Sequence, residues 1–266
     1  MIYIATSYRT LNVLNRFLSS RLNNLQFCFL ILNDVKEKFI NIPELESSKL
    51  MIFNNGICLE NYLIKKWDKN DIFLSFDIFH FYSTSFLKNI NFRCANFHPS
   101  FLPSYKGVNP INWGLLNNEK IWGCTWHIMN DEIDSGKIIQ QKKFNISSKT
   151  SQFDLNFYCL IEGIKMIPYV INSIQNESYS FKLIDNVKTS FYNSNKKPEI
   201  NVITLKDAKK IKNVIPYSKY KAWRWNVKIN DLIVTALSDT SSFGDIKLSK
   251  TILLDNKLFY YGTTKL

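Results

Sequence analysis

The chain has 266 residues, a length that fits one large domain followed by a smaller one. Hydrophobic residues make up 45% of it and charged residues 21%, which excludes a mainly disordered chain, and the 8 Gly and 7 Pro exclude collagen-like and other low-complexity classes. The formal net charge of +12 predicts an anionic partner.

No segment of the sequence is typical of a membrane anchor or an exported protein. The most apolar run, Phe27 to Leu32, is far shorter than the ~20 residues that span a bilayer. The first residues resemble a strand rather than a secretory signal. The 5 Cys are widely spread and form no C-x-x-C pair, which predicts neither a disulfide framework nor a metal site. We therefore expect a cytoplasmic protein without a bound metal.

The first half of the chain alternates between short apolar runs and stretches with helical spacing. The runs predict strands at Ile2–Ala5, Phe27–Leu32, Lys49–Phe53, Ile72–Phe76 and Phe92–Phe97, and helices at Leu11–Leu22 and Leu59–Trp67. This order predicts an α/β fold with a parallel-dominated sheet and helices on both faces. In such sheets the ligand lies beyond the carboxyl ends of the strands, which indicates the residues after Phe76 and Phe97.

The next stretch predicts a short helix, two strands and a long helix. The short helix covers Pro110–Leu116, with Pro in its first turn. The strands Gly123–Ile128 and Lys137–Phe144 follow, joined by a polar turn. The long helix runs from about Ser151 to Ile174, capped by Thr150 or Ser151 and bent at Pro168.

After residue 175 the composition changes to Asn, Lys and Ser, so we expect a catalytic domain over residues 1–178 and a smaller, basic, mostly-β domain over 179–266. The expected elements there are strands at Leu232–Leu237, Thr251–Leu254 and Leu258–Tyr261 and a basic helix at Lys206–Val214. Residues 189–228 carry ten Lys or Arg and two Asp or Glu, a net charge of +8. This segment is a solvated basic face, a nucleic-acid surface or a wall beside a phosphorylated substrate.

The chemistry-bearing residues follow the last of the early strands. Asn96 and His98 are two residues apart, so on an extended chain they point to the same side, and Pro99 keeps His98 out of helical geometry. An imidazole there could move a proton, and a carboxamide could bind a developing oxyanion. On spacing alone, His98 could equally cap a turn while Asn96 bonds loop backbone.

The motif N-F-H-P-S-F-L-P-S-Y-K-G at 96–107, followed by H-x-M-x-x-x-I-D-S-G-K-I at 127–138, resembles the folate-dependent formyltransferases. The resemblance covers about Asp71 to Phe144 and, more loosely, the strand order from Met1. It implies a Rossmann-like catalytic domain, N10-formyltetrahydrofolate as cosubstrate, no metal, and an amine as the formyl acceptor.

The resemblance places the family's catalytic residues on Asn96, His98 and Asp134. His98 would take the proton of the attacking amine. Asp134 would hold the imidazole and raise its pKa, and Asn96 would donate to the oxyanion. His127 is a weaker candidate, expected to be half-buried and hydrogen-bonded.

The resemblance also implies that the pterin bonds mainly to backbone in two segments, which are His80, Phe81 and Tyr82, and Met129, Asn130 and Asp131. Many relatives have Gly where this chain has Glu132. If that position needs a positive φ, Glu132 is strained or the turn differs.

Three branches of the family differ in the amine they formylate. The glycinamide ribonucleotide branch has a Gly-rich loop after the first strand, whereas residues 6–12 contain no Gly. The methionyl-tRNA branch has a larger C-terminal domain and a first-strand turn that are not found, although the basic 189–228 segment keeps tRNA open. The sugar N-formyltransferases resemble this chain best, in the K-G-x-N-P-x-x-W stretch from Lys106 to Trp113.

We therefore expect a sugar N-formyltransferase that acts on a nucleotide-linked, dTDP-type amino-dideoxy sugar for a surface glycan such as an O-antigen. Arg9, Lys106 and Asn109 are the candidate substrate contacts. The aromatic residues Tyr217, Tyr220, Trp223 and Trp225 could stack on the base or form the core of the small domain. The alternatives are a methionyl-tRNA formyltransferase and a non-catalytic, basic nucleic-acid-binding protein, and Asn96, His98 and Asp134 argue against the latter. A homodimer is left open, because many α/β enzymes of this kind are dimers.

Overall fold

The computed structural model describes residues 1–32, 48–147, 150–179 and 190–192, together with the backbone of the strands between residues 199 and 263. The chain divides into two compact units. Residues 1–106, 123–143 and 158–189 belong to the first unit, and residues 107–122, 144–157 and 190–266 belong to the second.

The first unit is built on a seven-stranded sheet with the order β3-β2-β1-β4-β5-β7-β8. Its strands are β1 (Ile2–Thr6), β2 (Phe27–Leu32), β3 (Lys49–Phe53), β4 (Ile72–Ser75), β5 (Cys94–His98), β7 (Ile121–Ile128) and β8 (Ile138–Asn145). The five strands from β3 to β5 are parallel, and β7 is antiparallel to β5. This mixed, mostly parallel sheet confirms the predicted α/β fold class.

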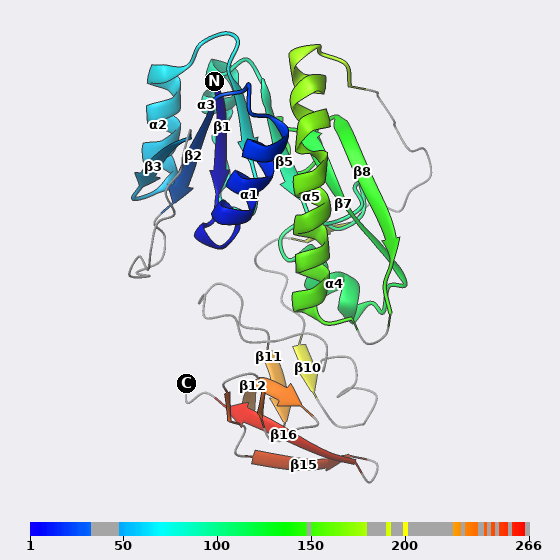
Figure 1. Cartoon of the computed structure of the whole chain (residues 1–266). Helices are drawn as coiled ribbons and strands as arrows, with labels where there is room; N and C mark the ends of the chain where they lie inside the picture. The colour runs from blue at the N-terminus through cyan, green and yellow to red at the C-terminus, as the bar shows by residue number, and fades with distance from the viewer. Residues whose placement is uncertain are drawn as a thin grey trace. The chain divides into compact units, whose positions relative to one another are not determined.

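Helices cover both faces of the sheet (Figure 1). They are α1 (Tyr8–Arg21), α2 (Gly56–Lys66), α3 (Thr84–Asn89) and α5 (Gln152–Gln175). A further helix, α4 (Pro110–Leu116), belongs to the second unit. Helices α1 and α5 lie on one face, and α2 and α3 pack on the other in a cluster that includes Leu59, Phe73 and Phe86. The sequence analysis did not predict α3.

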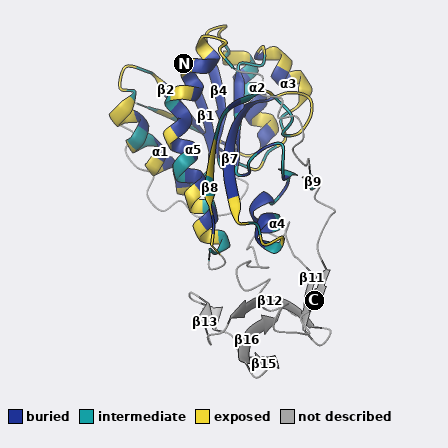
Figure 2. Cartoon of the chain, turned by 90° about the vertical axis from the view of Figure 1, so that its right-hand side faces the viewer, coloured by how far each residue is buried: buried dark blue, intermediate teal, exposed yellow. Residues whose placement is uncertain are grey.

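The central strands are buried along their length, which explains their continuous apolar sequence. Every residue of β1 and β4 is buried, as expected for parallel strands covered on both faces. Figure 2 shows this as a dark blue sheet between helices whose outer surfaces are exposed. The carboxyl ends of these strands therefore form a rigid edge for the loops that follow them.

Helix α5 begins at a reciprocal cap. The Ser151 hydroxyl accepts a hydrogen bond from the Asp154 backbone N–H at 3.1 Å, and the Asp154 carboxylate accepts one from the Ser151 backbone N–H at 3.0 Å. The helix continues through Pro168 to Gln175. Its middle is fixed to the sheet by a hydrogen bond from Trp126 Nε1 to the Gly163 carbonyl at 2.9 Å. No described helix is long and apolar enough to cross a bilayer.

The second unit contains α4, the paired strands β6 (Lys106–Gly107, at the boundary between the units) and β9 (Phe191–Tyr192), and the C-terminal strands. The C-terminal strands are β10 (Glu199–Asn201), β11 (Asn226–Ile229), β12 (Leu232–Ser238), β13 (Ser242–Phe243), β14 (Ile246–Lys247), β15 (Lys250–Leu254) and β16 (Lys257–Thr263). Strands β12, β15 and β16 overlap the three strands expected there. The expected helix Lys206–Val214 and the aromatic residues Tyr217, Tyr220, Trp223 and Trp225 lie outside the described residues.

Candidate functional site

The register between β5 and β7 brings four polar side chains onto one face of the sheet. Asn96 lies opposite His127, and His98 lies opposite Thr125. Because alternate residues of a strand share a face, Asn96 and His98 point to the same side. This confirms the strand geometry expected from their spacing.

The turn after β7 returns Asp134 to these residues. Its ends are fixed by a hydrogen bond from the Met129 backbone N–H to the Cys94 carbonyl at 3.2 Å and by one from the Ile128 N–H to the Lys137 carbonyl at 2.8 Å. Gly136 is required here, because a Cβ at this position would lie 1.7 Å from the Ile128 carbonyl oxygen.

The positive φ of this turn falls on Asp134, at 51°, and not on Glu132. Glu132 is therefore unstrained, and the replacement of a family glycine by Glu132 is accommodated by the turn.

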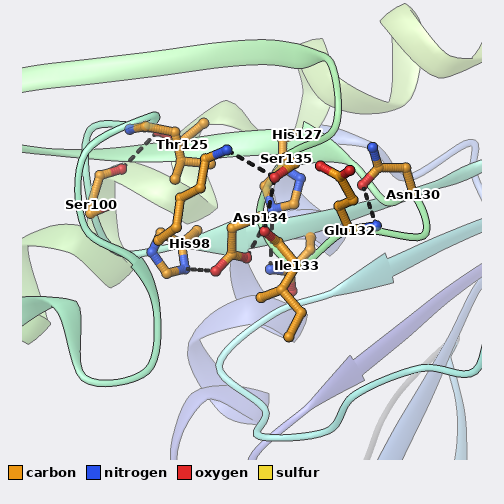
Figure 3. A network of polar contacts seen from close by, with 12 residues as sticks. His98, Ser100, Thr125, His127, Asn130, Glu132, Ile133, Asp134 and Ser135 are labelled. Atoms are coloured by element: carbon orange, nitrogen blue, oxygen red, sulfur yellow. Dashed lines mark hydrogen bonds and ion pairs between the residues drawn. The ribbon is translucent and has the colours of Figure 1, made fainter. Parts of the chain in front are cut away.

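The structure places Asp134 between two histidines (Figure 3). His98 Nδ1 lies 3.3 Å from one carboxylate oxygen of Asp134, and His127 Nε2 lies 3.5 Å from the other. Asn96 Nδ2 is 3.3 Å from His127 Nε2. The three residues singled out in the sequence thus converge, and His127 joins them as a fourth.

Hydrogen bonding defines the protonation pattern of His98. Its Nε2 lies 2.8 Å from the Tyr105 carbonyl oxygen, which can only accept, so Nε2 carries a proton. In the neutral ring, Nδ1 therefore presents a lone pair beside Asp134. A second proton at Nδ1 would turn this contact into a charge-assisted hydrogen bond.

Burial and charge act on His98 in opposite directions. Burial lowers the pKa of His98 below its ordinary value of 6.5, and although Asp134 and the bond to Tyr105 raise it, burial outweighs them. The sequence analysis anticipated only the effect of Asp134. His98 is thus neutral at pH 7 and can accept a proton.

The loop that supplies the Tyr105 carbonyl is fixed by side chains of β7 and β8. The Thr125 hydroxyl donates to the Ser100 carbonyl at 2.7 Å and accepts from the Leu102 backbone N–H at 3.1 Å. Gln141 Nε2 donates to the Leu102 carbonyl at 2.8 Å. These bonds hold the loop on which the orientation of His98 depends.

The second ring nitrogen of His127, Nδ1, is hydrogen-bonded to a backbone carbonyl. This Nδ1 lies 2.9 Å from the Ile128 carbonyl, so Nδ1 carries a proton, and Nε2 of the same ring lies 3.3 Å from Asn96 Nδ2. His127 therefore orients the Asn96 amide and leaves the second N–H of that amide for another acceptor. It is buried more deeply than expected.

The two predicted substrate cations of the first unit both have internal partners. Lys106 Nζ donates to Ser135 Oγ at 2.8 Å, beside Asp134. Arg9, on α1, binds both carboxylate oxygens of Asp77, with Nε at 2.8 Å from one and Nη2 at 2.5 Å from the other. Asn109 belongs to the second unit, where it precedes α4 with a φ of 54°.

The residues predicted for the first pterin segment divide between the protein interior and the surface. His80 Nε2 lies 2.8 Å from a carboxylate oxygen of Glu60. The Tyr82 ring packs edge-on against Phe73, and burial raises the pKa of Tyr82. The Phe81 side chain is exposed. The side chains of His80 and Tyr82 thus serve the fold, which leaves the backbone of this loop as its candidate binding group.

The second pterin segment adjoins the same hydrophobic cluster as the first. Met129 is buried in the same hydrophobic cluster against which Tyr82 packs. Asn130 and Asp131 are exposed, and Asn130 Oδ1 accepts a hydrogen bond from the Glu132 backbone N–H at 3.3 Å. Within the described residues, no group of three His, Cys, Asp or Glu side chains is placed to hold a metal ion.

Sequence reasoning missed several groups that surround the site. The Asp77 and Glu60 carboxylates belong to no motif, and their partners Arg9 and His80 lie 68 and 20 residues away in the sequence. The Tyr105 carbonyl lies within the motif at 96–107, but a backbone carbonyl carries no sequence signal. His127 could have been recognised from the pairing of the strands that contain Asn96 and His127, had their register been known.

Comparison with known proteins identifies the segment that holds this site. Residues 71–171 match the family model described as formyl transferase, and this range contains Asn96, His98, His127 and Asp134. Residues 71–171 are therefore similar to the formyl transferases. This match agrees with the family resemblance seen in the sequence.

The curated relatives are methionyl-tRNA formyltransferases. The one from Borrelia turicatae is 30% identical over 169 residues, which cover 62% of this chain and 52% of the relative. The chain spans between about a third and three fifths of the length of the first relatives it matches.

Solved structures with this formyl transferase fold match over nearly the full chain. The N-formyltransferase from Helicobacter canadensis, solved with folinic acid and dTDP-3-aminofucose, has a TM-score of 0.63 at 20% identity and covers 99% of both chains. A 4-N formyltransferase from Francisella tularensis has a TM-score of 0.64 at 17% identity and covers 100% of this chain and 97% of that one. At such identities the match establishes the fold.

Proposed function

We propose that this protein transfers the formyl group of N10-formyltetrahydrofolate to the amine of a nucleotide-linked amino-dideoxy sugar. The observation that carries the proposal is the convergence of Asn96, His98 and Asp134 inside the segment that is similar to the formyl transferases. A carboxamide donor, a neutral buried imidazole and a carboxylate are the groups that acyl transfer to an amine needs.

The residues at the site fit a reduced folate. The two candidate backbone segments, residues 80–82 and 129–131, adjoin one hydrophobic cluster, and β4 and β5 place Ser75 opposite Asn96. A pterin bound between these segments would therefore lie beside the catalytic groups. The bound cosubstrate would supply an electrophilic formyl carbon.

Each residue of the triad has a defined part in the proposed transfer. As the amine nitrogen bonds to the formyl carbon, the free N–H of Asn96 donates to the formyl oxygen, on which negative charge develops. The amine loses a proton, which His98 takes at Nδ1. Asp134 then holds the imidazolium at Nδ1, and the Tyr105 carbonyl holds it at Nε2. As the bond between the formyl carbon and the folate nitrogen N10 breaks, His98 would return the proton to that nitrogen, so that the formamide and tetrahydrofolate are the products.

A sugar acceptor is supported by two features. The K-G-x-N-P-x-x-W stretch resembles the sugar branch, and structures of sugar N-formyltransferases match this fold over nearly their whole length. A nucleotide diphosphate that used Arg9 would compete with Asp77 for the guanidinium. Lys106, beside Asp134, is the cation nearer to the triad.

Methionyl-tRNA is the second candidate acceptor. The curated relatives carry that name, and residues 189–228 have a net charge of +8 that suits a phosphate backbone. The proposal for a sugar therefore depends on a direct comparison of acceptors.

The test is a panel of acceptors assayed with N10-formyltetrahydrofolate. We expect saturable turnover with a dTDP- or GDP-linked amino sugar and none with methionyl-tRNA or glycinamide ribonucleotide. The His98→Asn variant in the same panel separates enzymatic transfer from background reaction. Formylation of the charged tRNA alone would replace the sugar proposal. The absence of turnover, together with nucleic-acid binding that weakens steeply with salt, would favour a non-catalytic binding protein.

A further inference from the structure

A buried carboxylate outside the triad holds one of the two candidate pterin segments. Glu60 lies on α2, and only 7% of it is exposed. One of its oxygens lies 2.8 Å from His80 Nε2 and accepts from the Ser83 backbone N–H at 3.2 Å. The other accepts from the Ser83 hydroxyl at 2.5 Å. All three bonds come from the loop between β4 and α3.

These bonds also fix the start of the next helix. Ser83 is the N-cap of α3, and its hydroxyl accepts a hydrogen bond from the Phe86 backbone N–H at 3.1 Å. A buried carboxylate is costly unless its oxygens are satisfied, so the loop and Glu60 stabilise each other. Glu60 thus links α2 to the loop and, through Ser83, to α3.

The position of the His80 ring requires the glycine at residue 56. Gly56 lies one helical turn before Glu60 on α2, and a Cβ at Gly56 would lie 2.0 Å from His80 Cε1. The ring therefore lies against the bare backbone of the first turn of α2. On another side it meets the Tyr82 ring edge-on, with centroids 4.8 Å apart.

The beginning of the same loop is held by a second carboxylate. Asp77 has a φ of 55°, and its side chain accepts hydrogen bonds from Ser7 Oγ at 2.5 Å and Arg9 Nε at 2.8 Å. The loop from residue 77 to residue 83 is thus tied to α1 at its start and to α2 at its end. Between the ties, Phe79 and Phe81 are exposed, at 57% and 55%.

We propose that Glu60 is a positioning residue that, through His80 and Ser83, holds the backbone of residues 80–82 in the conformation that binds the reduced folate. This inference rests on the proposed function. A loop that is already ordered does not lose conformational freedom when the ligand binds, so its affinity is higher. Glu60 itself touches the loop and not the reacting atoms.

The test compares variants that release the loop in two independent ways. Glu60→Ala removes all three bonds, and Gly56→Ala displaces the His80 ring without changing any charge. We expect each to weaken the affinity for 5-formyltetrahydrofolate by ~10- to 100-fold, equivalent to ~1.4–2.8 kcal/mol. Each should also raise the KM for the formyl donor, while kcat and the KM for the amine stay near wild type. Glu60→Gln should restore most of the affinity, because an amide can keep the bonds to His80 and the Ser83 N–H.

A matched control comes from another buried carboxylate. Asp71 accepts a hydrogen bond from the N-terminal ammonium at 2.8 Å, at the opposite end of β4. Asp71→Asn should lower stability without changing folate affinity. Hydrogen exchange should speed up at residues 80–83 in Glu60→Ala and not in Asp71→Asn. The combination of Glu60→Ala with Gly56→Ala should be less than additive, because both act through His80.

The outcomes separate the two proposals. If the wild-type protein binds no 5-formyltetrahydrofolate, the proposed function fails, and this inference fails with it. If the wild type binds and the Gly56→Ala and Glu60 variants bind equally well, only the positioning role is overturned. Should Glu60→Ala not fold, Gly56→Ala still decides the question, because unchanged folate affinity in that variant would overturn the positioning role.

Discussion

The Asp134→Asn variant tests the electrostatics of the site directly. Asparagine has nearly the same shape as aspartate, so the turn and the contact to His98 Nδ1 are kept while the negative charge is lost. At 3.3 Å, an opposite charge is worth ~5 kcal/mol to the imidazolium in an effective dielectric of about 20. Because tenfold in rate corresponds to ~1.4 kcal/mol, a loss of roughly 10²- to 10⁴-fold in kcat is expected.

The assay measures initial rates of formyl transfer at saturating donor and acceptor. We expect the loss in kcat, with both KM values near wild type, because Asp134 acts when His98 becomes charged. The pKa of His98 should fall further, since Asp134 raises it, so the acid limb of the rate profile should move to lower pH. Asp68→Asn, at an exposed turn before β4, is the control. A kcat within about threefold of wild type would refute the assigned role of Asp134.

Three further predictions follow from particular contacts. Stability should decrease as the pH falls through 6.5, because the unfolded chain protonates at His98 before the folded protein, whose pKa at His98 is lower. Turnover should decrease only at a lower pH, where His98 of the folded protein takes up a proton. Rate and denaturation profiles measured over the same pH range test both, and His98→Asn should flatten the stability profile. Thr125→Val should cost ~1–3 kcal/mol in urea unfolding, because it leaves the buried Leu102 N–H without its acceptor, and a cost near zero would show that the loop rearranges. Ser151→Ala should cost ~1 kcal/mol and leave kcat unchanged, because it removes only the cap of α5.

The strands and most helices could be predicted from the sequence because local periodicity determines them. The run Ile2–Ala5 became β1 with one added residue, and Pro110–Leu116 became α4 as predicted. Helix α3 was missed because it spans only Thr84–Asn89, too short for a helical pattern to repeat. The helix starts after its N-cap Ser83, and the Ser83 hydroxyl donates a hydrogen bond to Glu60, which lies on helix α2.

At the site, too, some features follow from the local sequence and others depend on residues that are distant in the sequence. Asn96 and His98 share a strand, so their common side follows from a spacing of two residues and needs no tertiary information. Asp134 could be connected to them only through the family resemblance, because nothing local shows that a turn after β7 returns to β5. The lowered pKa of His98 depends on the tertiary structure, because burial of the ring lowers this pKa by more than the charge of Asp134 raises it.

The sequence by itself thus determined the α/β architecture and the residue types available for proton transfer, because both follow from patterns among near neighbours. Only the tertiary structure decided which groups form hydrogen-bonded pairs. The pairs are His127 with Asn96, the Tyr105 carbonyl with His98, Asp77 with Arg9, and Glu60 with His80. These pairs join segments that the strands of the sheet, parallel and antiparallel, bring together with the helices packed on them. Their chemistry depends on distances of about 3 Å, which local patterns in the sequence do not encode.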